Sequence, residues 1–348
     1  MTGTDRNSNL FKVAIVGGAS LKGKEVRDAL SERNFPSVDI KLLDDEDALG
    51  QLEQVNDEPT FIQSVSPEQL EGVDFAFLAA DQLSTAGNWS TARDAGCDLI
   101  DLSYALENNT DVELRAPWVE RELGHTRAAG LKTAPVVVAH PAAVAMAILL
   151  SRVQKVAPLR LASAVIGLPA SEYGRRGMDE LHDQTVNLLS FQQMPTAVFG
   201  AQSAFNMYVQ SVKDTQPSLA ESEARIVRHF VKITGGAVIT PSVLSVQTPV
   251  FHGCTMAIFL LTEGHATATA LQKALHGPHV TVSDSAEDYP SNVNIAGVDN
   301  ILASLREDGA GGNGYWLFAA CDNLRLPSLL AVECAEEMAL TRPRGTLQ

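Results

Sequence analysis

The chain has 348 residues, of which 45% are hydrophobic and 20% are charged. This is an ordinary globular composition, and the length is sufficient for two domains. The formal net charge of −16 argues against nucleic acid or an anionic membrane as a partner, because both repel an acidic surface. High solubility is the simplest meaning of this charge.

The cysteines and the start of the chain bear on the cellular compartment. Cys97, Cys254, Cys321 and Cys334 are scattered, without the spacing of metal ligands, so we expect neither a metal site nor structural disulfides. Residues 1–10 are polar and lack the apolar core of a signal peptide. No run of about 20 apolar residues could span a bilayer. These features predict a cytoplasmic location.

The first part of the chain alternates predicted strands with predicted helices. Strands are expected at residues 11–16, 38–43, 73–80, 98–102 and 136–139, with helices following the first and the third. Such alternation is typical of a parallel, doubly wound sheet.

A glycine-rich turn, GGASLKG, directly follows the first strand and opens a helix. This order of strand, turn and helix predicts a Rossmann-type domain. Ser20 stands where a middle glycine would let the backbone approach a pyrophosphate, so binding of a cofactor stays open. The residues expected to contact a dinucleotide are Gly17, Gly18, Ser20, Leu21 and Gly23.

Asp44 begins an acidic run, DDED, at the end of the second predicted strand. It follows Gly17 by 27 residues, a little more than is usual for the acid that hydrogen-bonds a ribose 2′-hydroxyl. Four acids would repel a 2′-phosphate, so NAD is favoured over NADP. A solvated acidic turn explains the run equally well. That the chain binds neither NAD nor NADP is the other alternative.

The stretch 136–150, VVVAHPAAVAMAILL, predicts a buried strand and a buried helix that begins at Pro141. The start of such a helix offers unpaired N–H groups and the positive end of a dipole. None of the side chains in the expected first turn can attack, protonate or bind charge; they are Ala142, Ala143, Val144 and Ala145.

The pattern changes after residue 159. Strands are expected at 161–168, 238–247, 256–262, 279–283 and 315–320, and helices at 175–189, 224–233, 266–275 and 328–338. More strands than helices predict an α+β domain with a mostly antiparallel sheet. We place the Rossmann-type domain at 1–140 and 320–348, and the α+β domain at 141–319.

Several stretches together resemble the aspartate-semialdehyde dehydrogenase family along nearly the whole chain: VAIVGGASLKGKEV with ERNFP, VVVAHPAAVA, AFNMYVQ, TPVFHGC, DYPSNVNIAG and YWLFAACDNLR. The resemblance implies a Rossmann domain and a second domain that carries the active site and the dimer interface. It implies the NADPH-dependent formation of aspartate semialdehyde from aspartyl phosphate, in amino-acid biosynthesis. In that reaction a cysteine thiolate attacks the acyl phosphate, and the resulting thioester accepts hydride.

The positions that match the family's catalytic residues hold other residues here. The family's asparagine-proline-asparagine-cysteine turn falls on 140–143, so Ala143 stands at the position of the nucleophile. The general-acid/base histidine falls on Cys254. No thioester can form on an alanine, so we expect no residue of this chain to perform the family reaction in the family's way.

The anion-binding positions differ as well. The two arginines that hold the substrate carboxylate and phosphate fall on Gln247 and Leu106. A glutamine falls near Ile166, or on Leu168 if there is a gap. Neither glutamine nor leucine reproduces a bidentate arginine clamp. We interpret the chain as a catalytically degenerate member with a scaffold, ligand-binding or regulatory role.

An inverted Cys–His pair is an alternative source of chemistry. Cys254 could be activated by His140 or by His252, since a neighbouring imidazole makes a thiol nucleophilic. The simpler interpretation is that Cys254 is a small buried hydrophobe.

Basic residues also gather on one predicted helix. Arg225, Arg228, His229 and Lys232 are three or four positions apart and therefore share a face. This face could bind a small anion in the substrate site, or it could be solvated and paired with acids.

Two further alternatives concern activity and partners. The chain could be an active NAD(P)-dependent oxidoreductase with altered chemistry in the same cleft. The resemblance implies a homodimer, and a heteromer with an active relative is the alternative. No metal, nucleic-acid or membrane partner is expected.

Overall fold

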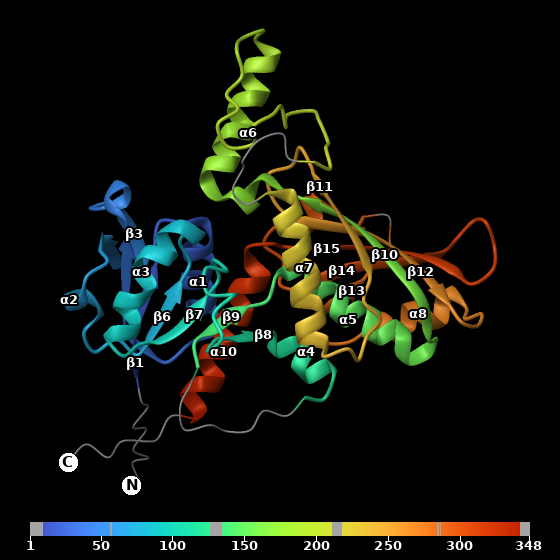
Figure 1. Cartoon of the computed structure of the whole chain (residues 1–348), viewed down its shortest axis with the longest axis horizontal. Coiled ribbons are helices and arrows are strands. Elements are labelled where there is room, and N and C mark those ends of the chain that lie inside the picture. The colour runs from blue at the N-terminus through green and yellow to red at the C-terminus, as the bar shows by residue number, and fades with distance from the viewer. Residues whose placement is uncertain are drawn as a thin grey trace. The chain divides into compact units, whose positions relative to one another are not determined.

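The computed structural model describes residues 10–55, 58–125, 134–210, 218–283, 285 and 287–341. The polar segment 1–9, used above to argue against a signal peptide, lies outside them. The described residues form two compact units, the first within 1–115, 128–138 and 328–348 and the second within 116–127 and 139–327 (Figure 1). The boundaries predicted at residues 140 and 320 differ from this division, because 116–125 and 320–327 group with the second unit.

The first unit contains a seven-stranded sheet in the order β5-β2-β1-β6-β7-β9-β8. Every pairing in it is parallel, which confirms the predicted doubly wound sheet. Its strands are β1 (Phe11–Val16), β2 (Ser37–Asp44), β5 (Gln63–Ser64), β6 (Phe75–Leu78), β7 (Asp98–Asp101), β8 (Glu113–Arg115) and β9 (Val136–Val138).

Helices and a small hairpin complete the first unit. The antiparallel hairpin pairs β3 (Leu52–Val55) with β4 (Glu58–Phe61). These two strands, β5 and β8 have no counterpart in the sequence prediction, since they have only two to four residues and no apolar run. The helices are α1 (Leu21–Glu32), η1 (Glu46–Ala48), α2 (Pro67–Leu70), α3 (Gln82–Asp94) and most of α10 (Arg325–Thr341).

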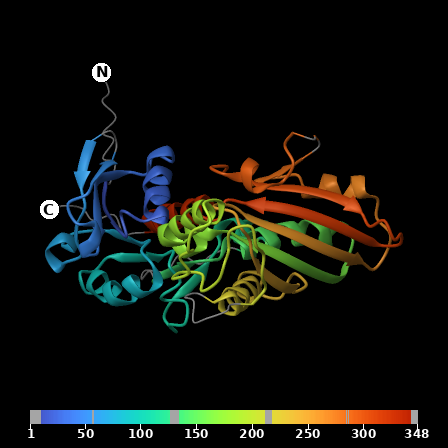
Figure 2. The same cartoon turned by 90° about the horizontal axis from the view of Figure 1, so that it is seen from above.

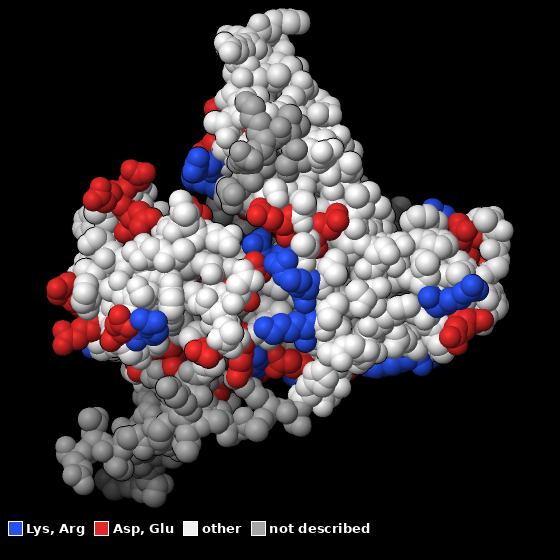
Figure 3. Space-filling model, viewed as in Figure 1, with Lys and Arg blue, Asp and Glu red and all other residues white. Residues whose placement is uncertain are grey.

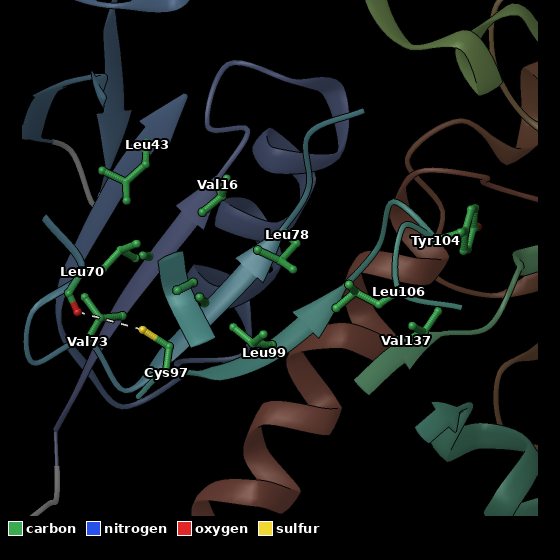
Figure 4. Packing of buried hydrophobic residues seen from close by; sticks show 13 residues of the cluster. Val16, Leu43, Leu70, Val73, Leu78, Cys97, Leu99, Tyr104, Leu106 and Val137 are labelled. Atoms are coloured by element: carbon green, nitrogen blue, oxygen red, sulfur yellow. Dashed lines mark hydrogen bonds between the residues drawn. The ribbon is translucent and has the colours of Figure 1, made fainter. Parts of the chain in front are cut away.

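The core of this unit is an apolar layer around the parallel strands. Val16, Leu43, Leu78 and Leu99 pack together on it, and the Cys97 thiol donates to the carbonyl of Leu70 (Figure 4). Central parallel strands are buried on both faces, which explains why their sequence reads as continuous apolar runs.

The second unit contains a six-stranded sheet in the order β11-β10-β12-β15-β14-β13. Its long strands β10, β12 and β15 run side by side in antiparallel pairs (Figure 2). The pairing is mostly antiparallel, as predicted, although β10–β11 and β13–β14 are parallel. The strands are β10 (Leu159–Leu168), β11 (Ser242–Gln247), β12 (Cys254–Thr262), β13 (Val280–Val282), β14 (Ile301–Glu307) and β15 (Gly314–Cys321). The prediction missed β14 and began β11 four residues too early.

The helices of the second unit are α4 (Pro117–Glu122), α5 (Pro141–Val156), η2 (Ala170–Tyr173), α6 (Gly174–Leu189), α7 (Leu219–Thr234), α8 (Ala268–Leu275) and α9 (Asn292–Ile295). As predicted, α5 begins at Pro141. Helix α7 begins five residues earlier than predicted, because Ser218 and Glu221 form a capping box. Helix α10 also begins earlier, at Arg325, and includes Pro327 in its first turn, where a missing N–H costs little.

One face of the six-stranded sheet is covered by helices, since α5 packs on β10, β12 and β15 while α8 packs on β13 and β14. The other face carries a row of register partners, Leu244, Val165, Ala257 and Phe318. The next row includes Phe259 and Trp316, whose ring centroids are 5.2 Å apart. Leu244, Val165 and Phe318 are each exposed by 40% or more. We call this surface the apolar sheet face.

Two properties of the structure agree with the sequence analysis. None of the helices within the described residues is long and apolar enough to cross a membrane. Acidic side chains are spread over the face of the molecule drawn in Figure 3, in keeping with the net charge.

Candidate functional site

Buried polar side chains gather at one end of the six-stranded sheet. Strand register places the ends of four strands there, because Leu168 pairs with Gln247, Gly167 with Thr255, and Cys254 with Cys321. Residues that follow these ends, together with the first turn of α5 and one face of α7, complete the group. We call it the sheet-end cluster; its members are His140, Ser171, Glu172, Arg225, His229, Gln247, Cys254, Cys321 and Asn323.

Two histidines in this cluster are oriented by backbone N–H groups. His140 caps α5, and its Nδ1 accepts a hydrogen bond from the backbone N–H of Ala142 at 3.2 Å. The backbone N–H of His140 in turn donates to Nδ1 of His229 at 3.0 Å. Because an accepting Nδ1 presents its lone pair, Nε2 is the nitrogen of each ring that can donate.

A carboxylate lies beside His140. Oε2 of Glu172 is 3.8 Å from Nε2 of His140. The other oxygen of Glu172 accepts from Nδ2 of Asn323 at 3.2 Å, and the same amide also donates to Ser171. Asn323 accepts from the backbone N–H of Gly253 and so joins β15 to the residues before β12. This network holds a charge-bearing group inside the second unit.

The chemical state of Cys254 follows from its surroundings. The hydrogen bond with Cys321 raises the pKa of the Cys254 thiol well above its ordinary value, and burial and the charges of Cys321 and Glu172 act in the same direction. A cysteine attacks as the thiolate. Cys254 is therefore a protonated thiol at neutral pH.

The first turn of α5 has the geometry of an anion or nucleophile site but not the chemistry. Ala142 and Ala143 have no exposed surface, and every residue of α5 from Pro141 to Val153 is buried. A methyl group neither attacks nor binds charge. The backbone N–H of Ala142 in this first turn instead donates to the side chain of His140.

The structure divides the predicted basic face of α7. Arg225 and His229 are buried in the sheet-end cluster, whereas Arg228 and Lys232 are exposed. The prediction that all four residues share one face is therefore wrong, because two of them are buried and two are exposed.

Gln247 is fully buried at the end of β11. Its Nε2 donates to the carbonyls of Leu168 and Thr248, whereas its Oε1 has no hydrogen-bond partner among the described residues. On the same face of β11, the hydroxyl of Ser245 also lacks a partner there. A buried acceptor without a donor is costly, so this end of β11 would accept a donor from a water or a ligand.

The remaining predicted substrate positions are structural in character. Ile166 is buried in β10 between Ser245 and Met256. Leu106 is a core residue of the first unit, and its backbone N–H donates to the buried carboxylate of Asp101. Burial raises the pKa of Asp101, and its hydrogen bonds oppose that rise.

His252, the other weak alternative, lies in the turn before β12. Its carbonyl accepts from Nδ2 of Asn292 at 3.1 Å. The groups that raise the pKa of the Cys254 thiol are Cys321 and Glu172, and neither histidine is one of them.

The glycine-rich turn of the first unit is packed against its own strands. A Cβ at Gly17 would lie 2.3 Å from the backbone nitrogen of Ala80, and one at Gly23 would lie 2.1 Å from the carbonyl oxygen of Gly17. A Cβ at Gly18 would lie 2.9 Å from Cβ of Leu42. These glycines are needed for the fold itself, with or without a cofactor.

Ser20 and Asp44 complete this turn. Ser20 caps α1, accepting from the N–H of Gly23 and donating to the carbonyl of Ala79, while Leu21 begins the helix. Oδ2 of Asp44 accepts from the N–H of Ala19 at 2.9 Å. Burial raises the pKa of Asp44, and the charges of Asp45 and Asp81 add to the rise. The predicted cofactor residues therefore meet at one turn.

Sequence reasoning missed part of the cluster. Ser171, Glu172, Cys321 and Asn323 are not among the site residues that the sequence predicts. The stretch Asp322-Asn323-Leu324-Arg325 was the available signal, but its partners follow only from the register of β12 and β15.

One unit with a parallel, doubly wound sheet and another with a mostly antiparallel sheet are typical of two-domain dehydrogenases. Family comparison matches residues 12–127 to the semialdehyde dehydrogenase NAD-binding domain and 153–326 to the semialdehyde dehydrogenase dimerisation domain. The chain belongs to the semialdehyde dehydrogenase family.

Relatives with two different names resemble the chain to a similar degree. An aspartate-semialdehyde dehydrogenase of Rickettsia bellii is 26% identical over 338 residues, covering 95% of this chain and 98% of that protein. A USG-1 protein homolog of Pseudomonas aeruginosa is 28% identical over 291 residues, covering 83% and 85%.

The fold is shared with solved structures. Aspartate semialdehyde dehydrogenase II of Vibrio cholerae, solved in complex with ASA, superposes with a TM-score of 0.83 at 24% identity, covering 96% of this chain and 99% of that one.

Proposed function

We propose that this protein keeps the fold and the dimer of the semialdehyde dehydrogenase family but does not form aspartate semialdehyde through a thioester, and acts as a ligand-binding or regulatory subunit. The observation that carries the proposal is the absence of a thiolate at either candidate position. Ala143 offers a methyl group, and the Cys254 thiol stays protonated. Without a thiolate, no acyl-enzyme can accept hydride.

For the cofactor, NAD is the better match. Asp44 stands at the end of β2 beside the glycine-rich turn. Burial raises its pKa, and the nearby charges of Asp45 and Asp81 add to the rise, so negative charges converge there. A ribose diol can donate to such a carboxylate, whereas a 2′-phosphate would be repelled. If NAD binds, it either accepts a hydride in a reaction or serves only as a bound ligand.

For the partner, a second copy of this chain is the expected occupant of the apolar sheet face. That face lies within the segment matched to a dimerisation domain. Exposed apolar surface of this kind marks an interaction site. The cytoplasmic location and the possibility of a heteromer with an active relative remain predictions from the sequence.

An enzyme assay tests the proposal. Purified protein is incubated with aspartate semialdehyde, phosphate and either NAD or NADP, and formation of the reduced cofactor is followed, with an active family member as positive control. We expect no turnover. Turnover that survives Cys254→Ala would contradict the proposal directly.

The second candidate function is an oxidoreductase with altered chemistry. The distance of 3.8 Å between Oε2 of Glu172 and Nε2 of His140 favours it, because a carboxylate close to an imidazole can exchange a proton with it. Turnover of the assay mixture that Glu172→Gln abolishes, while Cys254→Ala leaves it unchanged, would support this function.

Binding of NAD separates a scaffold from a ligand-binding protein. A ligand that binds only the native state raises the unfolding midpoint. A Gly17→Val variant is unsuitable as a control because the added side chain would strike Ala80. Asp44→Asn, which keeps the size of the side chain, is the better variant.

A further inference from the structure

Two of the cysteines face each other across neighbouring strands. Cys254 is the first residue of β12 and Cys321 is the last residue of β15, and the two are direct partners in the antiparallel ladder. Direct partners point to the same face of a sheet, with Cα atoms about 4.5–5.5 Å apart. A disulfide requires about 4.4–6.8 Å. These Cα separations overlap, so the strand register places the two cysteines within reach of a disulfide.

The side chains are also in contact. The Cys254 thiol is hydrogen-bonded with Cys321, and both residues are fully buried as free cysteines. The two other cysteines, Cys97 and Cys334, belong to the first unit. Cys254 and Cys321 are therefore the cysteines of the second unit, and the pairing of β12 with β15 brings them together.

We propose that Cys254 and Cys321 are a reversible oxidation site that forms an intramolecular disulfide when hydrogen peroxide is the oxidant. The proposal does not depend on the function proposed above. It assigns a modification to the sheet-end cluster of this chain.

The reaction has two balanced steps. One cysteine, as the thiolate, attacks an oxygen of peroxide; the O–O bond breaks, a sulfenic acid forms, and the leaving hydroxide takes a proton to become water. The sulfur of the other cysteine then attacks the sulfenic sulfur. The S–S bond forms, the S–O bond breaks, and the departing hydroxide takes the thiol proton as a second water. Two thiols lose two electrons and one peroxide becomes two waters.

The surroundings make this oxidation slow and pH-dependent. Because the hydrogen bond with Cys321, burial and nearby negative charge all raise the pKa of the Cys254 thiol, little thiolate is present at neutral pH. Both cysteines lie at strand ends, and terminal pairs open more readily than the centre of a sheet. Oxidation should therefore accelerate as pH rises.

A substitution of Glu172 should change the rate of this oxidation. Its charge is one of the groups that raise the pKa of the Cys254 thiol. Glu172→Gln removes the charge and keeps the hydrogen-bonding shape. We expect it to increase the thiolate fraction and hence the rate of disulfide formation by several-fold at neutral pH.

The experiment uses the full chain. The reduced protein is treated with hydrogen peroxide between pH 7 and pH 9, quenched with catalase, denatured, and alkylated, and its peptides are mapped by mass spectrometry without reduction. We expect loss of two of the four thiols, one linked peptide pair containing Cys254 and Cys321, recovery of both thiols with dithiothreitol, and a higher unfolding midpoint of the oxidised protein.

Matched variants make the result specific. Cys97→Ser should still form the linked pair, whereas Cys321→Ser should accumulate a sulfenic acid on Cys254 that dimedone traps. The proposal is overturned if all four thiols remain free at pH 9, if the link joins other cysteines or two chains, or if Cys321→Ser loses as many thiols as the wild-type protein. The map of the unmutated chain is decisive even if a variant fails to fold.

Discussion

The backbone N–H of His140 donates to Nδ1 of His229 at 3.0 Å and so joins the start of α5 to the middle of α7, 89 residues further along the chain. This N–H is fully buried with its residue. A buried N–H that loses its acceptor costs more than an ordinary hydrogen bond contributes. The contact therefore has a structural role, whatever ligand the sheet-end cluster binds.

The first prediction concerns this contact. His229→Ala removes the acceptor and should lower the free energy of unfolding by about 1–3 kcal/mol. Urea denaturation followed by circular dichroism measures the change. Arg228→Ala, at the exposed neighbouring position, is the matched control and should stay within about 0.5 kcal/mol. Equal midpoints for the two variants would show that the contact contributes nothing.

The second prediction compares substitutions at two glycines. Gly23→Ala should destabilise the protein by about 1–3 kcal/mol, because the new Cβ would lie 2.1 Å from the carbonyl oxygen of Gly17. Gly87→Ala, inside α3 with open space around its Cβ position, should stabilise by about 0.5–1 kcal/mol. Thermal unfolding of both variants gives the signs. The same sign for both would refute the packing argument.

The third prediction concerns the cofactor. At equal concentration, NAD should raise the unfolding midpoint more than NADP, by an amount that corresponds to about 2.7 kcal/mol when NAD is at 100 times its Kd. Asp44→Asn should reduce this difference because it removes the charge that repels a 2′-phosphate. Asp47→Asn, in the same acidic run and exposed to solvent, should leave it unchanged.

The pH dependence of that midpoint shift follows from Asp44. Burial raises its pKa above the ordinary value of 3.8. Only the ionised carboxylate accepts fully from a ribose hydroxyl, so stabilisation by NAD should be complete above the raised pKa. It should weaken as pH falls through that value, before 3.8 is reached. A shift that is constant down to pH 3.8 would mean that Asp44 does not contact the ligand.

The fourth prediction tests the partner. Phe318→Asp puts a charge in the middle of the apolar sheet face and should convert a dimer into a monomer, as measured by light scattering after size-exclusion chromatography. Val293→Asp, which replaces an apolar residue of α9 exposed by 84%, is the control and should leave the dimer intact. A monomeric wild-type protein would contradict the assignment of this face.

Local sequence patterns predicted the elements that depend on neighbouring residues. The apolar run before the glycine-rich turn predicts β1, and Pro141 predicts the start of α5, because proline favours the first turn of a helix. The short strand β8 and the alternating strand β14 were missed. A strand of three residues has no periodicity to detect, and its stability comes from the neighbour with which it pairs.

The site divides in the same way. The sequence alone determined that the first turn of α5 carries no nucleophile and that Asp44 follows the second strand of a dinucleotide-type domain. Only the tertiary structure decided that Glu172 lies against His140, that Asn323 holds Glu172, and that Cys254 meets Cys321. The reason is physical: these contacts depend on strand register and on helix placement, which are set by burial over the whole sheet and not by the residues that touch.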